Sequence, residues 1–236
     1  MYSLCPVNPA VRDYAVTLCK DITSRYPLTG LSLETPGFLP FVHGYHHEFA
    51  QIEQNDWLNT ALALCFCDHC TAAAQQQGIA VKALQQRLAR QLHDYLASTV
   101  TVSADMAQQW LLADLVTDSE LQALLRWRCA QVTTLVQTIR AELRNDVTLA
   151  VIPTVQRPSA LSWLEGSDLA ALAQAADTLE VPFYETSPQR VAADAWDVIR
   201  RIGHNRLRGI LRPGPPDMHN RAQLSASIDA LHQQGI

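Results

Sequence analysis

Three cysteines and a histidine fall within six residues, in the string Cys-Phe-Cys-Asp-His-Cys at 65–70. Thiolate and imidazole are ligands that zinc takes in structural sites, usually four of them in a tetrahedron. The candidate metal ligands are Cys65, Cys67, Cys70 and His69. Since no second Cys-x-x-Cys is present, a fourth ligand would come from His69, Cys5, Cys19 or a loop histidine. Zinc is therefore a candidate cofactor, and buried free thiols that close a helix-turn are the alternative.

A carboxylate at the end of a short apolar run is the second feature that could do chemistry. Glu34 follows residues 30–33, and this run, bounded by Gly and Pro, predicts a buried strand. Enzymes with parallel sheets place catalytic groups where strands end, so Glu34 is a candidate acid/base or an acceptor for a substrate hydroxyl. A salt bridge to an arginine such as Arg212, or a helix cap, is the alternative role.

Glycoside hydrolysis uses two carboxylates that flank the bond to be cleaved. The carboxylates on later loops that could partner Glu34 are Glu165, Asp168, Glu185 and Asp217. Asp217 lies in a stiff, proline-rich loop together with Arg212, so we assign it the second catalytic role. We expect Arg212 and Glu185 to contact substrate, and Trp163 to offer a platform on which a sugar ring could stack.

The loop beyond Glu34 is rich in imidazoles. Four side chains there could line a substrate pocket or bind a divalent metal: His43, His46, His47 and Glu48. Their order differs from the His-Glu-x-x-His pattern, which places two ligands on one face of a helix. We expect these side chains to contact substrate, with metal ligation and a simple solvated loop as the alternatives.

The composition narrows the class of protein. The chain has 236 residues, 48% of them hydrophobic, which is enough for one α/β domain or two small ones. Its net charge is -5 and its 18 basic residues are scattered, which argues against a nucleic-acid partner. No apolar run approaches the roughly 20 residues of a membrane helix, and the N-terminus lacks signal-peptide features. We therefore expect no membrane partner, a cytoplasmic location and reduced cysteines.

Short apolar runs alternate with helical patterns, which predicts βαβ units and a parallel sheet. The four predicted strands begin at Leu31, Val147, Leu179 and Leu207. Before the first strand, a helix opens at Pro9 with Asn8 as its N-cap. The region between the first and second strands has helical patterns throughout and is longer than a simple crossover requires.

These patterns predict about half of a (β/α)8 barrel, because such a barrel needs eight strands and usually about 250 residues. We therefore expect an α/β fold, an incomplete TIM-type barrel with a helical insertion after the first strand. Residues 1–38 and 145–236 would form the partial barrel. Residues 39–144 would form the inserted helical subdomain, which carries the Cys-x-Cys-x-x-Cys segment.

Two motifs resemble a known group of sequences. The order Cys5-Pro6-x-Asn8-Pro9-x-Val11-Arg12, then Tyr26-Pro27-Leu28-x-Gly30-Leu31-x-Leu33-Glu34, resembles the middle of glycoside-hydrolase-like (β/α)8 barrel proteins. The string Cys65-Phe66-Cys67-x-x-Cys70, with Gly78-Ile79 after it, is similar to a segment of uncharacterised bacterial members. The resemblance covers mainly residues 4–80. It implies that Glu34 is the acidic residue ending the fourth barrel strand, and that the strands here are the fourth to seventh.

The first expectation is a glycoside-hydrolase-like protein that binds or cleaves a carbohydrate or another small molecule, with Glu34 as acid/base. In many retaining barrels the nucleophile follows the seventh strand, whereas here that strand runs into Arg212. This difference favours an alternative, a noncatalytic binding or structural protein. Such a barrel remnant would need a complementing chain, or a copy of itself as a homo-oligomer, to cover its strand edges. A metal-dependent hydrolase using the loop from His43 to Glu48 is the third hypothesis.

Overall fold

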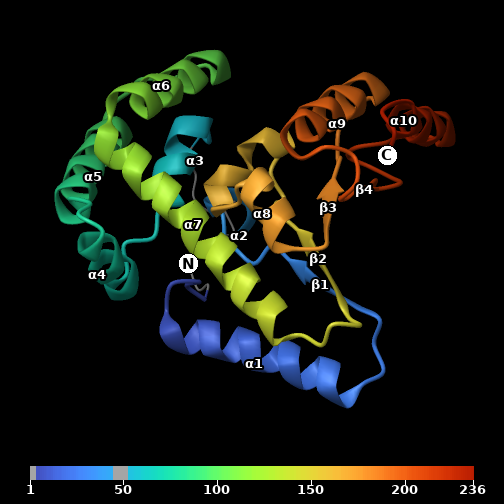
Figure 1. Ribbon diagram of the computed structural model, residues 1–236. Helices are drawn as coiled ribbons and strands as arrows, with labels where there is room; N and C mark the ends of the chain where they lie inside the picture. The colour runs from blue at the N-terminus through green and yellow to red at the C-terminus, as the bar shows by residue number, and fades with distance from the viewer. Residues whose placement is uncertain (1–3, 45–52) are drawn as a thin grey trace.

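A parallel sheet of four strands forms the centre of the molecule (Figure 1). The computed structural model describes residues 4–44 and 53–236. The strands are β1 (Gly30–Glu34), β2 (Thr148–Ile152), β3 (Thr178–Pro182) and β4 (Leu207–Ile210). They lie side by side in chain order, every neighbouring pair is parallel, and Glu34 pairs with Ile152 across β1 and β2. The prediction of four parallel strands is confirmed.

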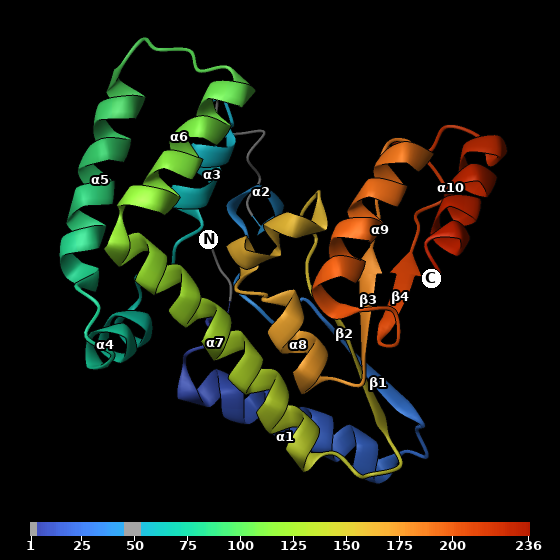
Figure 2. The same ribbon diagram turned by 45° about the horizontal axis from the view of Figure 1, so that its top comes forward.

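Helices pack on one face of this sheet (Figures 1 and 2). They are α1 (Pro9–Arg25), α7 (Ser119–Glu142), α8 (Leu169–Ala175), α9 (Pro188–Ile202) and α10 (Arg221–Gln233), with the short 3₁₀ helix η2 (Ser159–Glu165) after β2. α7 packs against α1 and α8, and α9 packs against α8 and α10. Strand and helix therefore alternate from β1 to α10, as the βαβ pattern predicts.

Local sequence signals mark the start of several of these helices. Asn8 caps α1, Asp118 caps α7 and Ser187 caps α9, each by accepting backbone N–H bonds through its side chain. Pro9 occupies the first position of α1, where its missing N–H has no helical partner to lose. These caps fix where the chain turns from loop into helix, and so fix the loops that could carry a site.

The two faces of the sheet differ in burial. The face covered by helices carries fully buried apolar side chains: Leu149, Val151, Leu179 and Val181. The opposite face carries Ser32, Glu34, Thr148 and Arg208, all of them exposed. Parallel sheets usually have both faces covered and consist of almost continuous apolar strands. Here polar side chains alternate with apolar ones, so the sheet has one polar side, which we call the open face.

A helical region separates β1 from β2 and projects away from the sheet (Figure 2). Besides α7, its described helices are α2 (Phe41–Gly44), α3 (Asp56–Leu62), α4 (Asp68–Gln76), α5 (Val81–Ala97) and α6 (Ala104–Thr117). Trp57 of α3 donates to Asp114 of α6 at 2.8 Å, and its ring meets Tyr95 and Trp110 edge-on. α7 packs against α5 and α6 as well as against α1 and α8, so it belongs to both parts of the molecule.

The structure shows an α/β fold in which four parallel strands alternate with helices. Within residues 4–44 and 53–236, no helix combines the length and the apolar character needed to span a membrane. Two sets of loops can position a site in this fold. One follows the carboxyl ends of the strands, and the other consists of the segment before α1 and the loop between α3 and α4.

Candidate metal centre

Four cysteine sulfurs from two distant segments meet at one point. The Sγ atoms of Cys5, Cys65, Cys67 and Cys70 all lie within 4.8 Å of one another. Cys5 Sγ is 3.4 Å from Cys70 Sγ and 3.6 Å from Cys67 Sγ. All four thiols are free, and these separations exceed the roughly 2.05 Å of a disulfide. A tetrahedral zinc site with Zn–S bonds of about 2.3 Å places its sulfurs about 3.8 Å apart, so this four-cysteine cluster has a spacing that suits zinc.

The loop between α3 and α4 positions three of these sulfurs. Cys67 is the N-cap of α4, and Cys70 lies in the first turn of that helix. Thr71 fixes the turn, because its N–H donates to the Cys67 carbonyl at 2.9 Å and its hydroxyl to the Phe66 carbonyl at 3.2 Å. The N-terminal end of a helix carries partial positive charge, which favours thiolates over thiols.

The fourth sulfur comes from the segment before α1. The Cys5 carbonyl accepts the Asn8 N–H at 3.0 Å, in a turn that leads into the capped start of α1. Arg12 of α1 donates to the carbonyls of Pro6 and Gln131, both at 3.1 Å. These bonds hold the segment against α7 and so direct Cys5 toward the α3–α4 loop.

His69 and Cys19, the other two named options for a fourth ligand, do not belong to this group. His69 is exposed on α4, and Cys19 is buried on α1. Among the described residues, the structure therefore brings the three predicted cysteine ligands together with Cys5 and leaves His69 outside.

Neighbouring sulfurs resist full ionisation when no cation lies between them. Hydrogen bonds from the Cys5 and Cys70 thiols lower the pKa of Cys65 to about 2. The hydrogen bond with Cys65 raises the pKa of Cys5 to about 11, and the contact with Cys5 also raises the pKa of Cys70. Like charges so close disfavour each further ionisation, whereas a bound metal deprotonates coordinating thiols outright. Four thiolate ligands leave no open coordination position, which is typical of structural zinc.

A buried arginine lies beside the cluster. Arg128 of α7 is fully buried, its Nη2 donates to the Leu164 carbonyl at 3.1 Å, and its guanidinium carbon is 4.2 Å from the Phe38 ring centre. Its Nε has no hydrogen-bond partner among the described residues. Burial lowers the pKa of Arg128 to about 10, and thiolate charge on Cys5, Cys65 and Cys70 of the cluster opposes this shift. Because Phe38 also lines the small cavity beside the cluster, Arg128 can complement a negatively charged metal–thiolate centre.

The two predicted catalytic carboxylates lie on different loops. Glu34 is the last residue of β1 and is exposed, and Thr35 after it has a φ of 44°, uncommon for a β-branched residue. Asp217 follows β4 and is buried, with Arg157 and Arg212 donating to its two oxygens at 2.5 and 2.6 Å. Since β1 and β4 are the edge strands, the two carboxylates follow opposite edges of the sheet.

The other predicted substrate contacts each have partners within the protein or line a different space. Glu185, after β3, is buried and pairs with Arg190 at 2.5 Å. Arg212 lies over the ring of Tyr184, 5.1 Å from its centre, in addition to its pairing with Asp217. Trp163 belongs to η2 and lines a groove beside α7 rather than the open face.

The histidine loop falls largely outside the described residues. His43 belongs to α2 by its backbone, and its side chain is not described. His46, His47 and Glu48 lie outside the described residues. Their expected contacts with substrate or metal therefore stay predictions.

One carboxylate on the open face, that of Glu180, is not among the site residues predicted from the sequence. Glu180 of β3 accepts a hydrogen bond from Ser32 Oγ at 2.8 Å and lies 3.4 Å from Arg208 Nη1. The Ser32 contact reaches across β2 and places Glu180 on the same face as Glu34, because alternate residues of a strand share a face. A charged residue inside the apolar run of β3 was the available signal.

Comparison with known proteins identifies no family. No protein-family model matches the chain, and no curated protein matches it significantly. Function must therefore be argued from the geometry of the chain itself.

Proposed function

We propose that the four-cysteine cluster binds a structural zinc ion. The observation that carries this proposal is that four sulfurs from two segments lie within 4.8 Å of one another, close to the spacing of a Zn–S₄ tetrahedron. The buried guanidinium of Arg128 supports it, since four thiolates around one Zn²⁺ carry a net negative charge that needs a counter-cation. In this proposal Cys5 is the fourth ligand in place of His69.

The proposed centre ties the segment before α1 to the helical region. α4 packs against α5, and the cluster links the start of α4 to the start of α1. A metal that binds only the folded chain adds its binding free energy to folding. The site would therefore hold the helical region next to the sheet that carries Glu34.

Zinc content of ligand variants tests the proposal. Elemental analysis of the untagged full chain, purified without chelator, is expected to give one zinc per chain. The Cys5→Ser and Cys67→Ser variants are expected to lose that zinc, whereas Cys19→Ser, which removes a buried thiol outside the cluster, keeps it. Full zinc content in both cluster variants would contradict the proposal.

We infer that the open face binds carbohydrate as a second function. Glu34 and Glu180 lie on that face two strands apart, which corresponds to roughly 10 Å between strand axes. Side chains that lean toward one another across this spacing could bring the two carboxylates to the separation of about 6.5–9.5 Å that inverting glycosidases use. The Ser32–Glu180 bond across β2 supports a curved sheet, because alternate strands share side-chain layers inside a β/α barrel.

Glu34→Gln and Glu180→Gln test this second function. A glycosidase of this kind loses hydrolysis of nitrophenyl glycosides in both variants while zinc content stays at one per chain. If the wild-type chain binds sugars without cleaving them, the noncatalytic alternative holds instead. That alternative also predicts a solution mass above that of one chain, because the edges of β1 and β4 would pair with a complementing chain or a second copy.

A further inference from the structure

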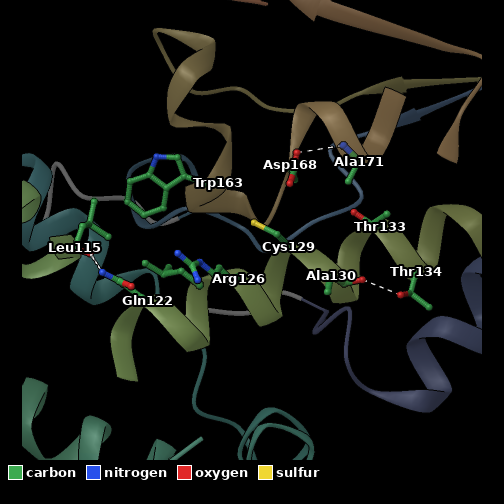
Figure 3. Close-up of a pocket in the computed structure, with 11 residues that line it drawn as sticks. Leu115, Gln122, Arg126, Cys129, Ala130, Thr133, Thr134, Trp163, Asp168 and Ala171 are labelled. Atoms are coloured by element: carbon green, nitrogen blue, oxygen red, sulfur yellow. Dashed lines mark hydrogen bonds between the residues drawn. The ribbon is translucent and has the colours of Figure 1, made fainter. Parts of the chain in front are cut away.

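A groove beside α7 has no role in either proposed function. It has a volume of about 630 Å³ and lies between α7, η2, the start of α8 and the end of α6 (Figure 3). Small-molecule sites have this size, and they combine a largely apolar wall with a few convergent polar groups. The groove has both, since Trp163, Leu125 and Ala130 line it together with Asp168 and Arg126.

The groove wall contains a buried hydroxyl group. Thr133 is 9% exposed, and its Oγ1 makes no hydrogen bond among the described residues. Thr134 and Thr138 of the same helix behave differently, because each donates to a carbonyl four residues earlier at 2.8 Å. Buried hydroxyls are normally paired. Figure 3 shows the Thr133 oxygen turned toward the space between α7 and α8, on the side of Cys129.

Three further side chains present different chemistry to the same space. Trp163 is half-buried on η2 and offers a flat aromatic wall. Asp168 uses Oδ1 to cap α8, accepting the N–H groups of residues 170 and 171 at 3.0 and 3.1 Å, which leaves Oδ2 for a ligand. Arg126 contributes an exposed guanidinium from α7. Burial raises the pKa of Cys129 to about 11, so this thiol is a neutral part of the wall.

We propose that this groove is a noncatalytic binding site for a pyranose sugar. One face of a pyranose consists of C–H groups, which pack on the electron-rich face of an indole such as Trp163. Its hydroxyls donate to a carboxylate and accept from a guanidinium, the two groups that Asp168 and Arg126 supply. The unpaired Thr133 hydroxyl gains a partner when such a ligand binds. A neutral ligand suits the groove because its two charged side chains have opposite signs.

Binding is tested on the zinc-loaded full chain with methyl glycosides of glucose, galactose, mannose and N-acetylglucosamine. Saturation-transfer NMR is expected to show contact with one ring face of at least one of them, and titration calorimetry to give a millimolar dissociation constant. Trp163→Ala is expected to weaken that affinity at least about tenfold. Asp168→Asn keeps the helix cap, because Asn caps as well as Asp, and is expected to weaken it about tenfold.

Thr133→Val separates a ligand contact from a packing role. It removes the hydroxyl with little change of shape, so sugar affinity should fall several-fold while the thermal midpoint stays or rises. Trp196→Ala on α9, where the side chain is 59% exposed outside the groove, should leave affinity unchanged. An equal loss of affinity in Trp196→Ala would mean that the aromatic residue in the groove is not the contact, and would overturn the proposal. No saturation transfer from any of the four glycosides, or full affinity in Trp163→Ala, would also overturn it.

Discussion

The carboxyl edge of the sheet and the four-cysteine cluster both gather polar side chains from distant parts of the chain. At the edge, opposite charges meet: Asp217 pairs with Arg157 and Arg212, and Glu185 pairs with Arg190. In the cluster, four groups of one kind meet, and their contacts are with one another. The stability of the folded chain is enough to explain the ion pairs at the edge, because buried charges need partners. The cluster places four electron-rich sulfurs together, an arrangement that a bound cation would stabilise.

Among the changes that test this comparison, removal of a cluster ligand should have the largest effect on zinc binding and stability. Cys70→Ser is expected to lose zinc and to lower the thermal midpoint by roughly 10 °C, because metal binding contributes directly to folding. A scan with and without chelator measures this shift on the wild type and the variant. Cys129→Ser, on α7 and outside the cluster, is the matched control and should keep its zinc. If chelator left the thermal midpoint of the wild type unchanged, the cluster would not depend on a metal. The contrast between the cluster and the carboxyl edge would then be lost.

Acid should release the metal over a narrow pH range. The raised pKa values of Cys5 and Cys70 mean that the metal-free cluster holds protons at neutral pH, and these must leave when zinc binds. Apparent zinc affinity therefore falls as pH falls, by at least about tenfold per pH unit. Competition with a zinc-sensitive dye at several pH values measures the slope. A flat profile would mean that the ligands are not protonated thiols in the metal-free chain.

Disrupting the ion pairs at the carboxyl edge should destabilise the fold less than loss of a cluster ligand does, and it should leave the zinc bound. Asp217→Ala leaves Arg157 and Arg212 without their shared carboxylate and is expected to destabilise the fold by about 2 kcal/mol, since both arginines are partly exposed. Asp146→Ala removes an exposed partner of Arg144 and should leave the stability almost unchanged. Urea unfolding measures both. Loss of zinc in Asp217→Ala would show that the two regions are coupled.

The smallest effect on the zinc site should come from replacement of Arg128, the cation beside the cluster. Arg128→Met removes a buried positive charge, so zinc affinity should fall about tenfold, while Arg128→Lys should retain most of it. The cobalt(II) absorption spectrum should keep its tetrahedral form in both variants, because the ligands are unchanged. Equal affinities in the Met and Lys variants would assign Arg128 a packing role only.

Local patterns predicted the fold better than they predicted the site. The strands and the cap at Asn8 follow from apolar runs bounded by Gly and Pro and from one polar residue before Pro9, all within a few positions. Cys5 lies 65 positions from Cys70, so no local spacing could single it out from Cys19 or His69. The pairing of Arg157 with Asp217 spans 60 positions and is likewise a product of the tertiary fold.

The carboxyl edge of the sheet also has one residue that local sequence predicts and one that it does not. The position of Glu34 at the end of β1 was predictable, because a strand ends where its apolar run ends. Glu180 was not, because a charge inside a short strand shows its role only when the sheet brings it to Ser32. Likewise, Trp163 was predicted as a stacking platform, but only the packing of η2 on α7 shows which space it lines.

X-ray absorption at the zinc edge of the purified chain is the sharpest test of the four-sulfur centre. We expect a first shell of four sulfurs at about 2.3 Å, supplied by Cys5, Cys65, Cys67 and Cys70. A shell containing nitrogen or oxygen ligands would contradict it, since His69 or a loop residue would then complete the site. Absence of zinc, with the four cysteines oxidised to disulfides, would contradict it as well.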